Sequence, residues 1–397
     1  MTRSCLPVGR RLGGALIVSG TTIGAGMLAT PLVTAAGGFI PGTLLYLMCW
    51  VTMVGMGLIM LEVHLWVGRG TNLISMSRSL LGPLGMWITS LLYIFLFYSL
   101  CVAYVSAGAD IMAWLYPKVH QVLGALIFTA VLSPFLLSGI AASDRLNRIL
   151  MILLVGSYGI LIALGLPKVR FTLLERTSWS ASIYALPVLF TAFSFQGTVP
   201  SLCDYLGGDV RATRQAIVWG TLLTLLVYVL WQLVVLGIVS AEGSGGLLEA
   251  LHSGKTAIWA LQHNLERSAL TWAAELFAFA AITTSYIGVN IGLIDFVSDG
   301  LKLPKRGKGL VTIAGTVFIP PLILTWIYPN IFIKALNLAG GIGCLLLLGI
   351  LPLIMLVVGK RSKHFQPQGA LFKCPILEIF VAIVLVFVAF SQILIGF

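Results

Sequence analysis

The sequence predicts an all-α polytopic membrane protein with eleven transmembrane helices. Of its 397 residues, 59% are hydrophobic and only 9% are charged, whereas soluble domains carry about 25% charged residues. The mean hydropathy is +1.03. A folded chain of this composition has too little polar surface to face water on all sides. Soluble, disordered and disulfide-stapled secreted classes are therefore excluded.

A helix needs about 20 apolar residues to cross about 30 Å of hydrocarbon. Runs this long and this apolar indicate helices rather than the ten-residue alternating strands of a membrane barrel. The predicted spans are 12–36, 42–67, 83–115, 121–140, 146–166, 181–200, 215–240, 269–298, 309–328, 335–358 and 375–397. The longest connection, 241–268, carries glycines and polar residues, and we expect it to fold over one mouth.

The distribution of basic residues predicts the orientation. The chain has 24 Lys and Arg against 13 Asp and Glu. With the N-terminus in the cytoplasm, the inner segments hold 17 of these basic residues and the outer segments hold 7, which follows the positive-inside rule. We therefore expect a multi-pass membrane protein with a cytoplasmic N-terminus. Because there is no basic stripe with interleaved aromatic residues, we expect no nucleic-acid partner.

Two of the predicted spans are interrupted. Residues 20–27 of the first span read GTTIGAGM and are followed by Pro31. The sixth span holds FSFQGTVP at 193–200, with Pro187 upstream. Each glycine weakens a helix by about 1 kcal/mol relative to alanine, and proline removes a backbone hydrogen bond. Both spans are therefore predicted to contain a helix break near the bilayer midplane.

The two interrupted spans are five apart and cross the membrane in opposite directions. The chain is thus predicted to be one transporter domain, 1–397, with a first repeat at about 12–166, a second at about 181–358, and an extra helix at about 375–397. Paired interrupted helices are typical of inverted-repeat transporters with a midplane site. The alternative is that the glycines only allow close helix packing.

The breaks also supply candidate substrate-binding groups. Free amides at a half-helix N-terminus attract a carboxylate, and free carbonyls attract an ammonium group or a cation. Aromatic rings would contact an aromatic substrate, and the amide of Gln196 must find a partner beside the break. The candidates are Thr22, Ile23, Gly24, Ala25, Gly26, Tyr98, Tyr104, Phe193, Phe195, Gln196 and Gly197. Ordinary packing is the alternative for each ring.

Charged residues inside the spans are candidates for ion coupling. Glu62 of the second span is a candidate proton carrier, because burial favours the neutral acid. The alternative is that Glu62 reaches water at the inner end of its helix. Asp110 and Glu275 lie near outer ends and are expected to be interfacial. Asp295 is expected to pair with Lys302 or a neighbouring residue.

Two motifs of this chain resemble a known family. GTTIGAGMLATP at 20–31 is similar to the opening helix of the hydroxy/aromatic amino acid permease family. ALPVLFTAFSFQGTVPS at 185–201, followed by YLGGDVR at 205–211, resembles that family's sixth helix and following loop. The resemblance covers essentially the whole chain. It implies a leucine-transporter-like fold with a 5+5 inverted repeat and discontinuous helices 1 and 6.

The same resemblance implies a function. It predicts a secondary active transporter of the inner membrane that imports aromatic amino acids, tyrosine or tryptophan, by proton symport with alternating access. The alternatives are a serine/threonine permease or an amino-acid exchanger, and sodium in place of protons. The predicted partners are the amino-acid substrate, the coupling proton and the lipid bilayer. The sequence does not specify an oligomeric state.

The resemblance further suggests a place for a coupling ion. In the leucine-transporter fold, an Ala-x-x-Thr-Ser segment of the eighth helix forms a cation site with carbonyls of the first. The matching residues are Ala281, Thr284 and Ser285, with the carbonyls of Gly20 and Ile23. The second sodium site of that fold uses an asparagine where this chain has Met27. This departure argues against two-sodium coupling and favours protons.

Other classes of protein lack support in the sequence. The six cysteines are scattered without a Cys-x-x-Cys motif, so we expect neither a metal site nor a redox site. The five histidines form no catalytic set with a neighbouring acid or serine, so an enzyme is not expected and no cofactor is implied. No filter motif is visible, which argues against a channel.

Overall fold

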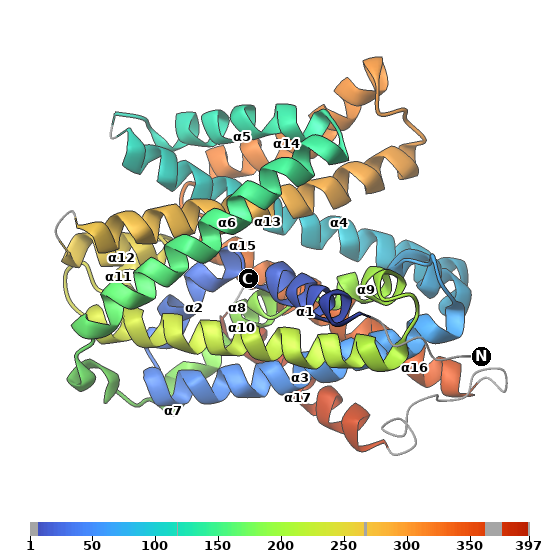
Figure 1. Cartoon of the computed structure of the whole chain (residues 1–397), viewed down its shortest axis with the longest axis horizontal. Helices are drawn as coiled ribbons and strands as arrows, with labels where there is room; N and C mark the ends of the chain where they lie inside the picture. The colour runs from blue at the N-terminus through green and yellow to red at the C-terminus, as the bar shows by residue number, and fades with distance from the viewer. Residues whose placement is uncertain (1–6, 117, 266–267, 362–374, 396–397) are drawn as a thin grey trace.

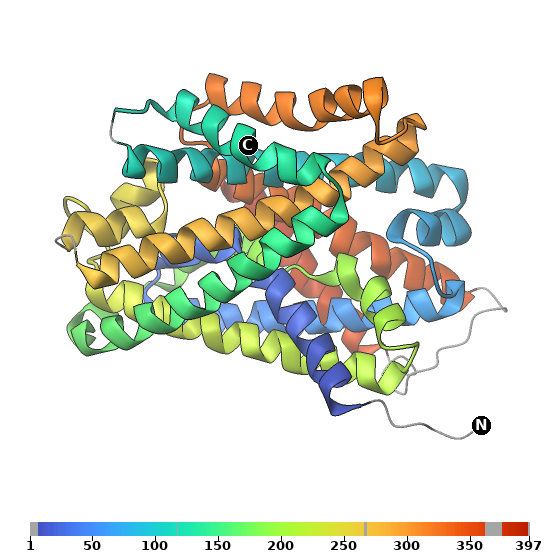
Figure 2. The same ribbon diagram turned by 45° about the horizontal axis from the view of Figure 1, so that its top comes forward.

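The computed structural model describes residues 7–116, 118–265, 268–361 and 375–395. Residues 1–6, and the last two residues of the final predicted span, lie outside this part of the chain. Every regular element within it is a helix, and the long helices run roughly along one common direction (Figure 1). In both views α5 and α14 lie on one side of the bundle, beyond α4 and α13 (Figure 2).

The first half of the chain forms the helices α1 to α6, followed by two short 3₁₀ turns. Their bounds are α1 Val8–Thr22, α2 Ala25–Ala35, α3 Phe39–Val67, α4 Leu73–Leu115, α5 Gln121–Leu137, α6 Ile140–Gly165, η1 Leu166–Lys168 and η2 Phe171–Leu174. The predicted start of the third span at residue 83 is ten residues late. Helix α4 begins at Leu73 and runs through a kink at Gly82, whose φ is +76°, because proline at position 83 disfavours helical backbone just before it.

The second half forms shorter pieces around the second break and then long helices. Their bounds are α7 Trp179–Ser182, η3 Ile183–Ala185, α8 Leu186–Ala192, η4 Gln196–Thr198, α9 Val199–Tyr205, α10 Val210–Ile238, α11 Leu247–His252, α12 Ala257–Asn264, α13 Ala269–Leu301, α14 Gly307–Ile327, α15 Phe332–Leu338, η5 Ala339–Ile350, α16 Leu351–Arg361 and α17 Ile376–Ile395. Element η5 is a π-helix that joins α15 to α16.

Nine helical segments of the described residues are long and apolar enough to cross a membrane. The bent pair α1 and α2, with an angle of 57°, would make a tenth. Helix α5 is apolar but has only 17 residues. Each of the eleven predicted spans coincides with one of these elements. A multi-pass helical membrane protein is thus confirmed, whereas a count of eleven depends on how α1–α2 and α5 are treated.

The lid is the segment 239–265, which connects α10 to α13 and contains α11 and α12. Its apolar side chains are buried, among them Leu247, Ala257, Ile258 and Leu261, each at most 1% exposed. Helices α11 and α12 both pack on α2, and α12 also contacts α13. This segment thus covers part of α2, and its place over one mouth of the protein stays a prediction.

The π-helix packs unusually close to α8. A Cβ atom on Gly340 would stand 1.7 Å from the carbonyl oxygen of Pro187 and 2.5 Å from the hydroxyl of Thr191. The position therefore requires glycine, because the backbone of α8 occupies the space of any side chain. This contact places the upper part of the sixth span directly against the wide turns of η5.

We expect Gly340→Ala to lower the apparent unfolding temperature of the purified protein, because the added methyl group pushes η5 away from α8. Overpacking of this kind costs about 1–3 kcal/mol. Gly156→Ala is the matched control, since Gly156 is also helical and its Cβ would meet no atom within 4 Å. Thermal unfolding in detergent measures both variants, and equal stability of the two would contradict the packing argument.

Candidate functional site

The first helix breaks at Ile23 and Gly24, both in extended backbone conformations. Helix α1 ends at Thr22, and α2 begins at Ala25. The backbone N–H of Ala25 donates a hydrogen bond of 3.0 Å to the hydroxyl of Ser285. A Cβ atom on Gly24 would stand 2.2 Å from the same hydroxyl oxygen. Glycine at this position thus lets α13 approach the free N-terminus of α2.

The sixth span breaks between α8, which ends at Ala192, and the short turn η4. The side chain of Gln196 is fully buried and serves this break locally. Its Oε1 accepts a hydrogen bond of 3.0 Å from the N–H of Phe195. Its Nε2 donates to the carbonyl oxygen of Met53 on α3 at 3.3 Å. The expectation that this amide finds a partner beside the break is confirmed.

One tyrosine connects the two breaks. The fully buried hydroxyl of Tyr228, on α10, lies 2.8 Å from the carbonyl oxygen of Thr22 and 2.8 Å from that of Ala192. These two carbonyls end α1 and α8, so two negative helix termini meet at one donor. The indole N–H of Trp231, one turn along α10, donates to the carbonyl of Met27 at 3.0 Å. Helix α10 therefore holds the broken ends in place.

The sequence analysis missed Tyr228 and Trp231. The only signal for them is two large polar-tipped rings three residues apart within a run of aliphatic residues in the seventh span. Buried tyrosine and tryptophan usually find a hydrogen-bond partner for the polar atom. Nothing local indicates that the partners lie at breaks about 200 and 36 residues away.

Aromatic rings surround the second break. The rings of Tyr46, Phe193 and Tyr228 contact one another edge to face, with centroids 4.9–6.3 Å apart. Phe193 and Phe195 are at most 2% exposed. The two breaks also touch directly, because a Cβ on Gly26 would lie 3.1 Å from the Cα of Ala192. Most of the residues predicted around the two breaks are thus brought together.

Of the four other predicted residues, Thr22, Tyr104 and Gly197 also lie at or beside the breaks, and only Tyr98 lies away from them. Thr22 bonds its own helix through the carbonyl of Val18 at 2.7 Å. Tyr104 is buried, and its hydroxyl interacts with the side chain of Ser285, beside the first break. Tyr98 instead donates to the carbonyl of Thr316 on α14 at 2.5 Å, so it is engaged with another helix. Gly197, in η4, is exposed.

The predicted ion-coupling hydroxyls are engaged with their own helix. Ser285 donates to the carbonyl of Ala281 at 2.8 Å. Thr284 donates to the carbonyl of Ala280 at 2.8 Å. Gly20 faces α6, where a Cβ would lie 3.3 Å from the terminal carbon of Met151. The hydroxyl of Ser285 therefore caps the N-terminus of α2. A cation-binding role of Ala281, Thr284 and Ser285 stays a prediction.

The intramembrane charges are paired more fully than expected. Glu62 is 1% exposed and lies 3.8 Å from the guanidinium of Arg214, so it does not reach water as its alternative required. Asp295 pairs with Lys305 at 2.6 Å, a neighbour of the expected Lys302. Lys302 itself has left-handed backbone and ends α13.

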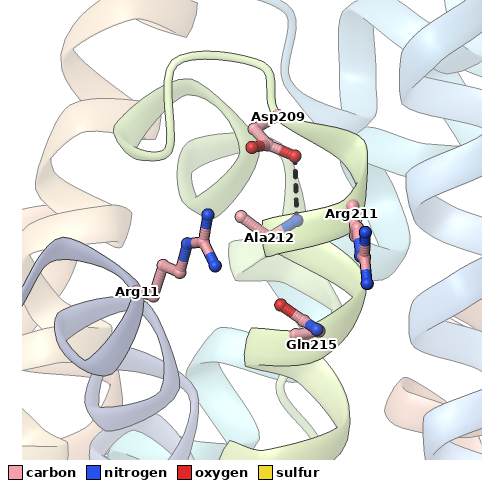
Figure 3. Close-up of a pocket in the computed structure, with 5 residues that line it drawn as sticks. All are labelled: Arg11, Asp209, Arg211, Ala212 and Gln215. Carbon is pink, nitrogen blue, oxygen red and sulfur yellow. Dashed lines mark hydrogen bonds between the residues drawn. The ribbon is translucent and has the colours of Figure 1, made fainter. Parts of the chain in front are cut away.

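A cavity of about 180 Å³ lies between the starts of α1 and α10. In Figure 3, Arg11 points from α1 toward this space, Asp209 accepts a bond from the N–H of Ala212, and Arg211 lies on the other side of α10. Nearby, the guanidinium of Arg10 donates to the carbonyl of Tyr205 at 2.9 Å and stands 5.5 Å from the centre of its ring. This latch fastens α1 to α9.

A helical membrane protein whose two broken helices meet in its interior belongs, by architecture, with the broken-helix transporters. The fold matches the solved structure of MhsT in complex with L-phenylalanine, with a TM-score of 0.68 over 98% of both chains at 17% sequence identity. At that identity the match shows the fold. Residues 9–395 match the model of the tryptophan/tyrosine permease family, and the chain belongs to this family.

Individual relatives agree with the family assignment. The chain is 32% identical to the tyrosine-specific transport system 1 of Haemophilus influenzae, over 83% of this chain and 84% of that protein. It is 32% identical to the tryptophan-specific transport protein of the same organism, over 90% and 89%. It is 28% identical to the low affinity tryptophan permease of Escherichia coli K12, over 89% and 88%. The resemblance found in the two motifs is thereby confirmed.

We expect Tyr228→Phe to speed amide hydrogen exchange at both breaks, because two buried carbonyls lose their donor. Such a loss costs about 1–3 kcal/mol, which corresponds to about fivefold to 150-fold in exchange rate. Tyr158→Phe is the matched control, since that hydroxyl also donates to a helix carbonyl, that of Val227 on α10, but to neither end carbonyl of the breaks. The measurement is hydrogen exchange with mass spectrometry of peptides 20–31 and 190–200. Equal exchange rates in the two variants would contradict the role of Tyr228 at both breaks.

Proposed function

We propose that this protein is a secondary active transporter of the bacterial inner membrane that imports aromatic amino acids, tyrosine or tryptophan, together with protons. The observation that carries the proposal is the meeting of the two breaks, where the backbone amide of Ala25 and the end carbonyls of Thr22 and Ala192 lie together. Membership of the tryptophan/tyrosine permease family supports the substrate class. The names of the relatives, tyrosine- and tryptophan-specific, point the same way.

The chemistry of the breaks fits an amino acid. A substrate carboxylate would take the place of the Ser285 hydroxyl at the N-terminus of α2, where the positive end of the helix dipole favours an anion. The ammonium group would bond the end carbonyls of the half-helices. Gly24 and Gly26 leave the backbone open to the ligand. The side chain would contact Phe193 and its neighbouring rings, edge to face.

The transport cycle we propose is alternating access. The chain would divide into two inverted five-helix repeats, about 12–166 and 181–358, with an extra helix after them and the N-terminus in the cytoplasm. On the inner side, the latch of Arg10 on Tyr205 holds α1 against α9. On the opposite end of the broken helix, the lid holds α2. Releasing one fastening at a time would expose the breaks to one side at a time.

Protons are the better candidate for the coupling ion. The hydroxyls of Ser285 and Thr284 already bond within the protein, and the thioether of Met27 is a poor ligand for sodium. Carbonyls of Gly20 and Ile23 remain the place where a single cation would bind. Glu62 remains a proposed proton carrier near the inner latch, with the guanidinium of Arg214 3.8 Å away.

Uptake by proteoliposomes tests this proposal. With the inside alkaline, we expect purified protein to accumulate labelled tyrosine or tryptophan, and unlabelled tryptophan to compete while serine does not. A protonophore should abolish accumulation, because the proton gradient is the driving force. An imposed sodium gradient at equal pH should have no effect.

Three results would contradict parts of the proposal separately. Competition by serine but not by aromatic amino acids would overturn the substrate class and favour a serine/threonine permease. Strict exchange without net uptake would favour an exchanger. Uptake that survives the protonophore but disappears without sodium would overturn proton coupling.

A further inference from the structure

Two carboxyl groups face each other beneath the lid. The rings of Trp114 on α4 and Trp272 on α13 meet at 4.7 Å. Deeper in the bundle, Cys101 contacts Asn290, so these two helices run antiparallel. Asp110 lies one turn inward from Trp114, and Glu275 lies one turn inward from Trp272. The two carboxyl groups therefore occupy matching positions on the facing sides of α4 and α13.

Both carboxyl groups are covered, and each has an oxygen without a donor. The side chain of Asp110 is 17% exposed, and its Oδ1 accepts from the ammonium of Lys255 at 2.9 Å. Glu275 is 6% exposed, and its Oε1 accepts from the amide of Gln262. Asp110 Oδ2 and Glu275 Oε2 are buried and have no hydrogen-bond partner. Both side chains are thus covered by lid residues, and their interfacial position in the membrane stays a prediction.

The partner of Glu275 distinguishes it from the other buried acid. Two carboxyl side chains are buried in the described part of the chain. Glu62 has an arginine beside it, whereas Glu275 has a neutral amide. Other acids are ion-paired: Asp144 with Arg148, Glu242 with Arg176, Asp295 with Lys305 and Glu378 with Lys360. A carboxylate buried without a cation is costly, and a bound proton removes the charge.

The charges around Glu275 do not compensate it. From α4, the carboxylate of Asp110 is close enough to repel a charge on Glu275. From α12, Gln262 offers a neutral donor. Lys255 already bonds both Asp110 and the side-chain oxygen of Asn330, at 2.9 Å each. The cluster thus contains two carboxyl groups and one ammonium group, which bonds Asp110, and one proton would neutralise it.

We propose that Asp110 and Glu275 form a proton-binding site under the lid, with the proton carried on Glu275 while the lid is closed. The proposal deepens the function above and rests on it, because it names the residue that takes up the coupling proton. The proton comes from water on the lid side and converts the Glu275 carboxylate to the neutral acid. It returns to water when the site next opens.

The lid links this proton to the broken helix. Lys255 and Gln262, the donors to the two carboxyl groups, both belong to the lid. The same segment packs on α2, the outer half of the first helix, through both α11 and α12. Opening the lid would remove both donors and expose both acids to water, where the ionised forms are favoured. Proton binding and lid closure therefore favour each other, and a higher pH on the lid side favours the open state.

Variants in proteoliposomes test the site. Glu275→Gln mimics the protonated acid, so we expect tyrosine exchange near the wild-type rate. Accumulation driven by a pH gradient should fall by about tenfold or more, a factor that ordinary coupling free energies produce. Substrate binding should also lose its dependence on pH. The control is Asp144→Asn, which removes an acid that lies outside the lid, is 49% exposed and is paired with Arg148, and which should behave as wild type.

A second variant gives a directional readout. Asp110→Asn removes the repelling charge and leaves Lys255 nearby, so Glu275 should ionise more readily. The pH at which substrate binding is half lost should then fall relative to wild type. This shift is measured by binding of labelled tyrosine at a series of pH values, and it distinguishes a proton site from a merely structural contact.

Each outcome bears on one claim. Wild-type accumulation and an unchanged pH profile in Glu275→Gln would overturn the site, as would an unshifted profile in Asp110→Asn if Glu275→Gln proved unable to exchange. Loss of accumulation in Glu62→Gln but not in Glu275→Gln would move proton coupling to Glu62. If wild-type protein transported no aromatic amino acid, the proposed function would fail first, and the same data would show it.

Discussion

Every backbone group that a helix break frees inside a membrane must find a partner within the protein, since lipid offers none. In this molecule one hydroxyl, that of Tyr228, serves the end carbonyls of both broken helices. On the other side of the first break, the hydroxyl of Ser285 accepts a hydrogen bond from the backbone. At the second break, the side chain of Gln196 does so. These bonds keep α1, α2, α8 and η4 together without forcing them to be continuous. A zwitterionic amino acid needs the same polar groups as hydrogen-bond partners. The residues that satisfy the helix breaks therefore also form the proposed binding site.

The sequence predicts the elements well and the contacts between them less well. Composition and long apolar runs suffice for a helical membrane protein, and the Gly-rich 20–27 and the segment 193–200 suffice for the two breaks. The bridge by Tyr228 is not predictable, because a tyrosine in an apolar helix is more often ordinary packing. Its role depends on how α10 lies against α1 and α8. The predicted start of α4 is late for a local reason. Pro83 has the sequence signal of a helix start, whereas the helix only kinks there and continues.

The surroundings of the charged side chains are also poorly predicted by the sequence. A hydropathy pattern depends only on neighbours along the chain. It places Asp110 and Glu275 near helix ends, where water is expected. Lys255 and Gln262 lie far from Asp110 in sequence, and the lid that carries them covers both acids. Glu62 is likewise buried beside an arginine of another helix. Whether an intramembrane acid is ionised is therefore a property of tertiary structure, which pattern reading alone does not reach.

The central claim is that substrate binds where the two breaks meet. A density map of the purified protein with bound tyrosine or tryptophan tests it most directly. The account predicts ligand density with its carboxylate at the amide of Ala25, displacing the Ser285 hydroxyl, and its ring beside Phe193. Ligand density anywhere else, with the hydrogen bonds of Ser285 and Tyr228 to the breaks unchanged, would contradict it.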